Sequence, residues 1–339
     1  MSRPQQNEIY LPDTMAKWPW PRRINPLYQE MKAGSDIWLK SFKPFTSESQ
    51  SIFDSCDFEH LRTACDLMNV LFVLDEYTDV ESAPGVREIA DIVLDALQNP
   101  SKRRQEGEIL LGEMARQFWE RAIQTATVSS QKHFIEAFAS YLDGVVAHAV
   151  VRGNGTIQTF DEYLKIRRED VGVRVTYSPF EFGLNIPDEV FYHPIIVEIS
   201  ECGVDLTIID NDIASYNKEQ AAGDDDFNSL TIIMRQLDVD LASAIDWVVD
   251  YHAQVQARFL SAFRRVPSFG GEVDRDVEQY ILGIANWIRS NHCWSFEGGR
   301  YFGRKGLEIQ STRRVPLLPK AKHDRTLKRQ QVIIPAVDI

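Results

Sequence analysis

Asp75 and Asp79 are four residues apart in the segment LMNVLFVLDEYTD, whose apolar spacing predicts a helix. Four residues correspond to about one helical turn, so both carboxylates project from the same face. Carboxylates this close repel each other unless a cation lies between them or water screens them, and hard oxygen ligands of this kind suit Mg²⁺. The pair therefore indicates a metal site, although an acidic helix end in solvent has the same pattern.

A second set of oxygen-bearing side chains consists of Asn211, Ser215 and Glu219. Their spacing of four residues aligns an amide, a hydroxyl and a carboxylate along one face of a predicted helix. The preceding segment VDLTIID is apolar enough to be buried, and Lys218 adds a positive charge beside Glu219. We interpret this pattern as a second site for a hard cation. An amphipathic helix that emerges into solvent is the alternative.

Two arginine-containing segments lie apart from these acidic sets. Arg300 and Tyr301 follow the aromatic stretch Trp294-Ser295-Phe296, and Arg167 begins the segment RREDVG. Arginine offers a rigid, always-charged fork that matches phosphate oxygens. Either segment alone is also typical of a protein surface. Together with two metal sites, they indicate a ligand that is polyanionic and bridged by metal ions, and a diphosphate fits this description.

Helical periodicity dominates the chain, so we predict an all-α protein. The predicted helices span 27–43, 59–78, 86–98, 106–127, 131–151, 158–170, 195–220, 238–264 and 273–293. The β-branched runs at 171–177 and 331–337 are too few to build a sheet. No fixed-period repeat or central linker is visible, so we expect one domain over 1–310 and a basic, flexible tail over 311–339. The alternative for the basic segment 304–330 is a flap that closes over an anionic ligand.

Composition narrows the function further. The 339-residue chain has a formal net charge of −13, which argues against a nucleic-acid partner. We see no signal peptide and no apolar run long enough to span a bilayer, so we expect a cytoplasmic protein. The four cysteines, at 56, 65, 202 and 293, form no CxxC pair and are interpreted as reduced, buried thiols.

These motifs resemble those of the class I terpene synthases, specifically the microbial sesquiterpene cyclases. Asp75–Asp79 is similar to their aspartate-rich D-D/E-x-x-D motif. Residues 211–219, with Lys218, match their N-D-x-x-S-x-x-K-E pattern, and Arg300-Tyr301 matches their downstream Arg-Tyr pair. By the same resemblance Arg167 is the arginine that senses the diphosphate, with Asp170 as linker and Val171 as effector. The resemblance covers approximately residues 8–310.

The resemblance extends to the basidiomycete Δ6-protoilludene synthases. The segments that carry it are 11–26, 61–79 and 203–225. In those enzymes a further helix and loop follow a triplet similar to Cys56-Asp57-Phe58. Here Phe58 runs directly into Glu59-His60-Leu61, so a piece about one short helix long is absent from this chain.

The resemblance implies a single α-helical barrel of the class I terpenoid synthase type with a central cavity. It implies that farnesyl diphosphate is ionised and cyclised to a C15 hydrocarbon such as Δ6-protoilludene, by a monomer or homodimer. A trinuclear Mg²⁺ cluster would be held by Asp75, Asp79, Asn211, Ser215 and Glu219. Diphosphate would be bound by Arg167, Lys218, Arg300 and Tyr301, of which Arg167, Arg300 and Tyr301 join Asp75 as catalytic residues. Phe72, Val171 and Trp294 would line the cavity.

Two other functions remain open from the sequence. A chain-elongating prenyl transferase would share the fold and the diphosphate chemistry, but such enzymes carry two aspartate-rich motifs. The Asn211, Ser215 and Glu219 pattern therefore favours a cyclase. The other possibility is a catalytically impaired helical homologue that lacks one helix, which the shortening after Phe58 supports and the intact metal-ligand patterns oppose.

Overall fold

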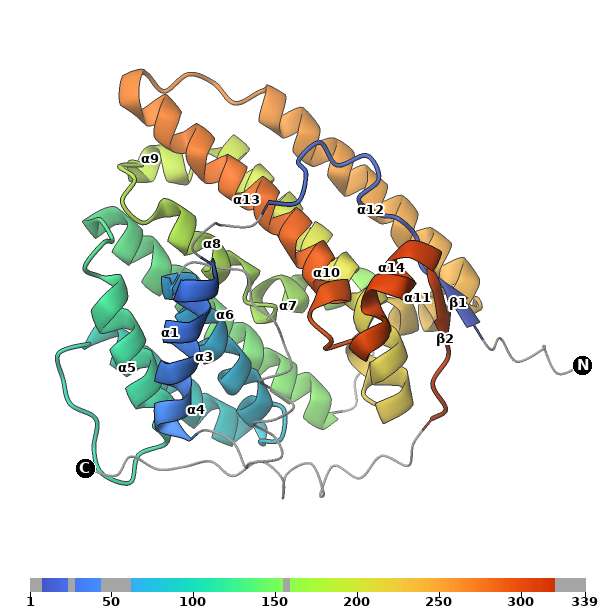
Figure 1. The fold of residues 1–339 in the computed structure, drawn as a ribbon, viewed down its shortest axis with the longest axis horizontal. Helices are drawn as coiled ribbons and strands as arrows, with labels where there is room; N and C mark the ends of the chain where they lie inside the picture. The colour runs from blue at the N-terminus through green and yellow to red at the C-terminus, as the bar shows by residue number, and fades with distance from the viewer. Residues whose placement is uncertain (1–7, 24–27, 44–61, 155–158, 321–339) are drawn as a thin grey trace, which may run out of the picture.

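The computed structural model describes residues 8–23, 28–43, 62–154 and 159–320. Helices make up nearly all of its regular structure, as the all-α prediction requires (Figure 1). The α-helices are α1 (Tyr28–Phe42), α3 (Arg62–Thr78), α4 (Ala83–Gln98), α5 (Leu110–Ala122), α6 (Val128–Asn154), α7 (Phe160–Asp170), α8 (Val173–Glu181), α9 (Asp188–Phe191), α10 (Pro194–Ala222), α11 (Ser229–Leu237), α12 (Leu241–Arg264), α13 (Gly271–Glu297) and α14 (Gly306–Thr312). Two 3-10 turns, η1 (Asp225–Phe227) and η2 (Gly303–Lys305), and two short strands, β1 (Glu8–Tyr10) and β2 (Arg314–Pro316), complete the described elements.

Local sequence signals set where the site-bearing helices begin and end. Helix α7 starts with a capping box, in which the Thr159 hydroxyl and the Glu162 carboxylate each accept a bond from the other residue's backbone N–H. Helix α10 begins at Pro194, where proline fits the first turn, and ends at Gly223 in the left-handed conformation. These caps define the length of the two helices that carry Arg167 and the Asn211 pattern.

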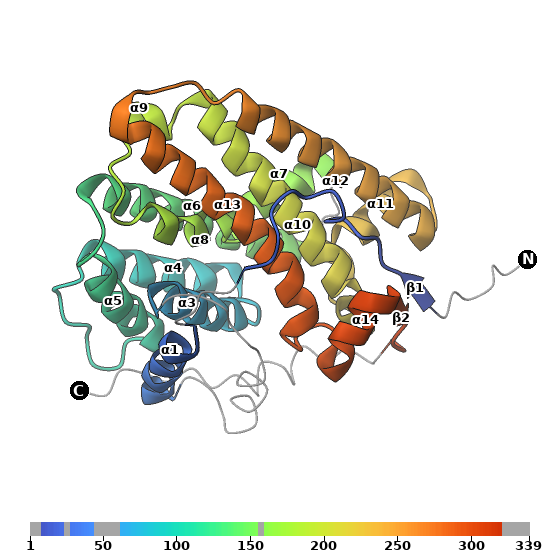
Figure 2. The same ribbon diagram turned by 45° about the horizontal axis from the view of Figure 1, so that its top comes forward.

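The interior contains two apolar clusters with the helices arranged around them. One cluster unites α10, α12 and α13 with parts of α7 and α8, and the other unites α1, α3, α4, α5 and α6. Figure 2 shows α10, α12 and α13 lying side by side, with α1, α3, α4 and α5 on the other side of the molecule. Met68 packs against both clusters. Space between two such walls is where a ligand cavity is expected.

Several elements were not predicted from the sequence. The run VGVRVTY at 171–177, noted only as a β-branched stretch, supplies the first five of the nine residues of α8. Gly172, at φ 67°, turns the chain into this helix, and Val173, Val175 and Tyr177 are buried. Tertiary packing here overrides the intrinsic preference of valine for strands. The short helices α9, α11 and α14 were also missed.

The beginning of the predicted tail belongs to the fold. Helix α14 continues to Thr312, and β2 pairs antiparallel with β1, with Val315 opposite Ile9. Both of these side chains are buried. The described fold therefore continues past residue 310, where the tail was expected to begin. The few isolated apolar residues of this basic segment give little sequence signal for a strand. Residues 321–339, and the shortening after Phe58, lie outside the described residues.

The segments at the two ends of the described chain form hydrogen bonds to α10 and α13. The Thr14 hydroxyl donates to Asp210 Oδ1 at 2.6 Å, and Trp18 Nε1 donates to the Ala285 carbonyl at 3.0 Å. On α10, Asn217 Nδ2 donates to the Pro316 carbonyl at 3.0 Å, and Asn217 Oδ1 accepts from Leu318 N at 2.9 Å. The β1–β2 pair thus fixes the half of α10 that contains the predicted metal ligands.

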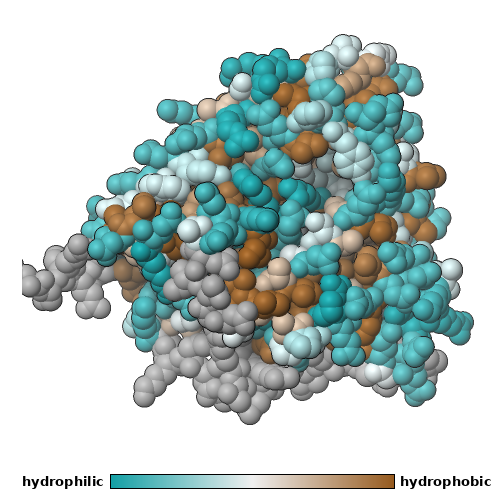
Figure 3. All heavy atoms as spheres, turned by 180° about the vertical axis from the view of Figure 1, so that it is seen from behind, coloured by the Kyte–Doolittle hydropathy of each residue, from teal (hydrophilic) through white to brown (hydrophobic). Residues whose placement is uncertain are grey.

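The prediction that no apolar run is long enough to span a bilayer is wrong for one described helix, since Val128–Gly153 in α6 is long and apolar enough by length and composition. One face of this helix packs into the interior, where Phe134, Phe138 and Leu142 are buried, and 33% of the apolar window is buried in all. The face shown in Figure 3 is largely hydrophilic, with hydrophobic side chains in separate patches. Cys65, Cys202 and Cys293 are buried, as expected, and Cys56 lies outside the described residues.

Candidate active site

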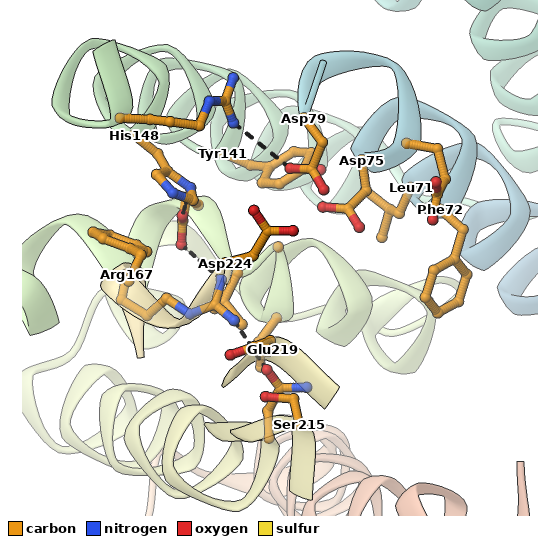
Figure 4. A pocket seen from close by; sticks show the side chains of 18 of the residues that line it. Leu71, Phe72, Asp75, Asp79, Tyr141, His148, Arg167, Ser215, Glu219 and Asp224 are labelled. Carbon is orange, nitrogen blue, oxygen red and sulfur yellow. Dashed lines mark hydrogen bonds and ion pairs between the residues drawn. The ribbon is translucent and has the colours of Figure 1, made fainter. Parts of the chain in front are cut away.

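A cavity of about 950 Å³ opens between the two apolar clusters. It is lined by α3, α6, α7, α8, α10 and α13, together with the segments after α10 and α13. Every site residue predicted from the sequence lies on its wall: Phe72, Asp75, Asp79, Arg167, Val171, Asn211, Ser215, Lys218, Glu219, Trp294, Arg300 and Tyr301. Figure 4 shows Asp75 and Asp79 projecting from α3 on one side, with Ser215 and Glu219 on the opposing α10.

The acidic wall is the C-terminal end of α3. Asp75 Oδ2 lies 3.5 Å from Arg300 Nη2, and Asp79 Oδ1 lies 3.7 Å from Arg152 Nη1. Burial, and then repulsion from Asp79, raises the pKa of the Asp75 carboxyl above its ordinary range, while Arg300 opposes part of that rise. About half of the Asp75 side-chain surface (49%) is still exposed toward the cavity. The carboxylate is thus accessible, and its negative charge is only partly compensated.

The opposing wall is the face of α10 formed by Asn211, Ser215 and Glu219. Asn211 Oδ1 accepts from Arg167 Nη2 at 3.0 Å, and Asn211 Nδ2 donates to the Tyr301 hydroxyl at 2.7 Å. Burial, followed by repulsion from Asp212, raises the pKa of Glu219 to about 7. Arg167 and Tyr301, which are far apart in sequence, therefore both form hydrogen bonds to the Asn211 side-chain amide.

The two walls offer the donor set of a hard divalent cation. All of the predicted ligands are oxygens, and burial, followed by repulsion from a neighbouring carboxylate, raises the pKa of both Asp75 and Glu219. No group of three or more His, Cys, Asp and Glu side chains suited to a metal occurs within the residues that the structure describes. The donors are instead divided between α3 and α10, so completing a coordination shell requires oxygens from a ligand or from water. The residues present fit a metal-bridged anion.

The remaining wall is aromatic and apolar. The rings of Phe72 and Trp294 are 6.0 Å apart, and the Arg300 guanidinium lies 5.1 Å from the centre of the Phe72 ring. Trp294 in turn meets Tyr301 edge-on, with ring centres 5.9 Å apart. Cationic and aromatic groups therefore adjoin at the boundary between the polar and apolar parts of the cavity.

Comparison with known proteins gives this geometry a family. The family model described as "Terpene synthase family 2, C-terminal metal binding" matches residues 66–258, more than half of the chain. That range contains both the acidic pair on α3 and the Asn211 pattern on α10. The chain belongs to the terpene synthase family. Binding of a divalent metal is accordingly a property of its family domain.

Curated relatives of this terpene synthase cover almost its full length. It is 58% identical to sesquiterpene synthase 14 of Postia placenta, over 99% of each chain. It is 52% identical to Δ6-protoilludene synthase 18 of the same fungus, over 96% of this chain and 97% of that one. Identity to the Δ6-protoilludene synthase of Armillaria gallica is 44%, over 92% and 94% of the two chains.

Solved structures confirm the fold at much lower identity. Germacradien-4-ol synthase from Streptomyces citricolor superposes with a TM-score of 0.70 at 19% identity, covering 82% of this chain and 96% of that one. Hedycaryol synthase in complex with nerolidol gives a TM-score of 0.70 at 16% identity, covering 84% and 100%. The predicted class I terpenoid synthase fold is therefore confirmed.

The structure adds polar residues to this terpene synthase site that no motif indicated. Asn228, which is fully buried, donates from Nδ2 to Glu219 Oε2 at 2.9 Å and to the Asp212 carbonyl at 3.0 Å. Arg152 Nη2 donates to the carbonyls of Thr78 and Glu81 at 2.8 and 3.0 Å, fixing the end of α3.

His148 also lines the cavity, one turn before Arg152 on α6. The only sequence signal for this pair was two basic residues four apart in an otherwise apolar helix.

Proposed function

We propose that this terpene synthase is a sesquiterpene cyclase that ionises farnesyl diphosphate with Mg²⁺ and cyclises the resulting cation to a C15 hydrocarbon. The observation that carries the proposal is the pair of oxygen-bearing walls on α3 and α10, which face each other across one cavity beside four diphosphate-binding candidates. The names of the curated relatives, sesquiterpene synthase and Δ6-protoilludene synthase, support the substrate and the product class.

The polar end of the cavity binds the leaving group in this proposal. Asp75, with Asp79, would hold magnesium on one wall, and Asn211, Ser215 and Glu219 would hold it on the other, in a three-metal cluster shared with diphosphate. When bound, Mg²⁺ supplies Lewis-acid neutralisation of the charge that develops on the diphosphate. Arg167, Arg300 and Tyr301 donate hydrogen bonds to the same oxygens, and the exposed Lys218 adds positive charge at the rim.

The apolar end of the cavity receives the allylic cation. Phe72 and Trp294 present aromatic faces there, and each cation–π contact contributes about 0.5–2 kcal/mol. Val171 limits the space beside Arg167. A cyclised hydrocarbon requires that water be kept from the cation, because water would trap it as an alcohol. The apolar wall provides this exclusion, and we propose Δ6-protoilludene as the product.

We further propose a cytoplasmic enzyme that acts as a monomer or homodimer, without a nucleic-acid partner. The net charge of −13 supports the absence of a nucleic-acid partner. The catalytic domain, expected over 1–310, is extended in this proposal to Leu318, which bonds to Asn217 and Gln220 of α10, and the basic segment beyond it is a tail.

The test is incubation of the purified protein with farnesyl diphosphate and Mg²⁺, followed by gas chromatography and mass spectrometry of the volatile products. We expect a cyclic C15 hydrocarbon that disappears with a chelator and falls at least about 100-fold in Asn211→Ala, as for other groups that stabilise developing charge. Val197→Ala is the matched control, because Val197 lies on the same helix but is exposed at the surface away from the cavity. Release of farnesol alone, or elongation to a longer prenyl diphosphate when isopentenyl diphosphate is added, would contradict the proposal.

A further inference from the structure

His148, on α6, is held at the edge of the cavity by residues of two other elements. Its Nδ1 lies 2.8 Å from Asp170 Oδ2, at the end of α7. Its ring stacks on Phe227 of η1, with ring centres 3.9 Å apart and planes inclined by 21°. About a quarter of the side chain (24%) is exposed, and it lines the cavity (Figure 4). A histidine held on its face and at one nitrogen has a fixed direction for the other nitrogen.

Asp170 connects His148 to the predicted diphosphate-sensing arginine. Its other oxygen, Oδ1, accepts from Arg167 Nη1 at 3.1 Å, and its side chain is almost completely buried. Because a carboxylate only accepts hydrogen bonds, Nδ1 of His148 carries the proton, and Nε2 is left as the ring atom for other partners. One buried carboxylate therefore orients two basic side chains from two helices.

The close approach of α6 and α7 accounts for this arrangement. Gly144 lies one turn before His148, and a Cβ atom at Gly144 would be only 2.6 Å from the backbone nitrogen of Asp170. A side chain of any other type would push the two helices apart. Arg152, one turn after His148, fixes the same helix to the end of α3. His148 is thus positioned with respect to both Arg167 and the acidic wall.

We propose that His148 is a further substrate-binding residue, whose Nε2 donates a hydrogen bond to the diphosphate that Arg167 also binds. This inference rests on the proposed function, since it assigns one more donor to the diphosphate of that substrate. With a proton on each ring nitrogen, His148 donates from Nδ1 to Asp170 and from Nε2 to the diphosphate. Asp170 contacts both His148 and Arg167, so the two side chains that would bind the diphosphate share one buried carboxylate.

The test measures binding of inorganic diphosphate in the presence of Mg²⁺ by isothermal titration calorimetry. His148→Phe keeps an aromatic ring to stack on Phe227 but removes both nitrogens, and we expect its Kd to rise by about ten- to a hundredfold, the range for a hydrogen bond to a charged group. His148→Gln restores an amide donor and should recover part of this loss. His193→Gln is the matched control, because His193 caps α10 outside the cavity and its variant should bind as the wild type does.

Each outcome has a definite meaning. Unchanged diphosphate binding in both His148 variants overturns the assignment, and so does an altered product mixture with unchanged affinity, which would mean that His148 acts on the carbocation. Failure of the wild type to bind diphosphate overturns this inference and the proposed function together. If His148→Phe does not fold, judged by its circular dichroism spectrum, the His148→Gln variant decides through the same Kd and through KM measured separately from kcat.

Discussion

At the scale of single residues, two of the predicted metal ligands, Asp79 and Glu219, are held by neighbours that no sequence motif includes. Asp79 faces Arg152, and Glu219 accepts from Asn228. Asn228 is also tied to Asp212, which accepts from the Tyr163 hydroxyl at 2.5 Å and from the backbone N–H of Ser229 at 3.0 Å. Such outer partners orient ligands, and their loss typically reduces metal affinity by about 10–100-fold.

Asn228→Ser is predicted to weaken metal binding by about tenfold or more, because it removes the amide that orients Glu219. Serine is also a good N-cap, so the second role of Asn228, capping α11 through Leu230 N, is largely retained. The measurement is the Mg²⁺ concentration at which inorganic diphosphate gives half of its maximal thermal stabilisation.

Asp240→Ser is the control for this prediction. Asp240 caps α12 at the surface by accepting from Ser243 N, and the metal requirement of its variant should match that of the wild type. If the two variants shift the Mg²⁺ requirement equally, Asn228 acts through general helix stability and not through Glu219.

At the scale of elements, the site depends on how closely α6 and α7 cross. Gly144 permits this crossing, and the consequence is that His148, Arg167 and Asp170 lie within reach of one another. A methyl group added at Gly144 would clash with backbone atoms of α7, which cannot rotate away as a side chain could. The helices would then have to move apart.

Gly144→Ala is therefore predicted to destabilise the protein by about 1–3 kcal/mol, the usual range for overpacking, despite the better helix propensity of alanine. Gly153→Ala is the control within the same helix, since a Cβ there meets nothing within 4 Å. It should be neutral or stabilising by up to about 1 kcal/mol. Urea unfolding followed by circular dichroism measures both, and equal effects would refute the argument from close approach.

The elements also show what the sequence can and cannot predict. Long helices such as α10 and α13 were predicted with ends close to those observed, and Asn211 and Arg300, predicted from motifs to share a ligand, line one cavity. The run at 171–177 was not recognised as helical, because its valines are buried by neighbours that only the tertiary structure supplies. Asn228 and His148 were missed for the same reason: their partners, Glu219 and Asp170, lie on other elements.

At the scale of the whole molecule, two apolar clusters lie on either side of a cavity. Segments near both ends of the described chain bind the helices α10 and α13 that form one of its walls. Strand β1 and the segment after it bind α10 and α13, and β2 continues the attachment along α10 through Asn217 and Gln220. The helix that carries the Asn211 pattern is thus clamped on the face away from the cavity. Its geometry depends on a segment that composition alone assigns to a tail.

A variant that ends at Thr312 is predicted to lose stability by about 2 kcal/mol or more, because burial of a valine side chain alone contributes about 1.5–3 kcal/mol and Val315 is 2% exposed. It also leaves Asn217 and Gln220 without their bonds to the segment 316–318. A variant that ends at Lys320 retains all of these contacts and serves as the control. Denaturant unfolding compares the two with the full chain, and inorganic diphosphate binding shows whether α10 still presents Asn211 correctly. If both truncated proteins matched the full chain in stability, β2 would contribute nothing measurable to stability and would not hold α10 in place.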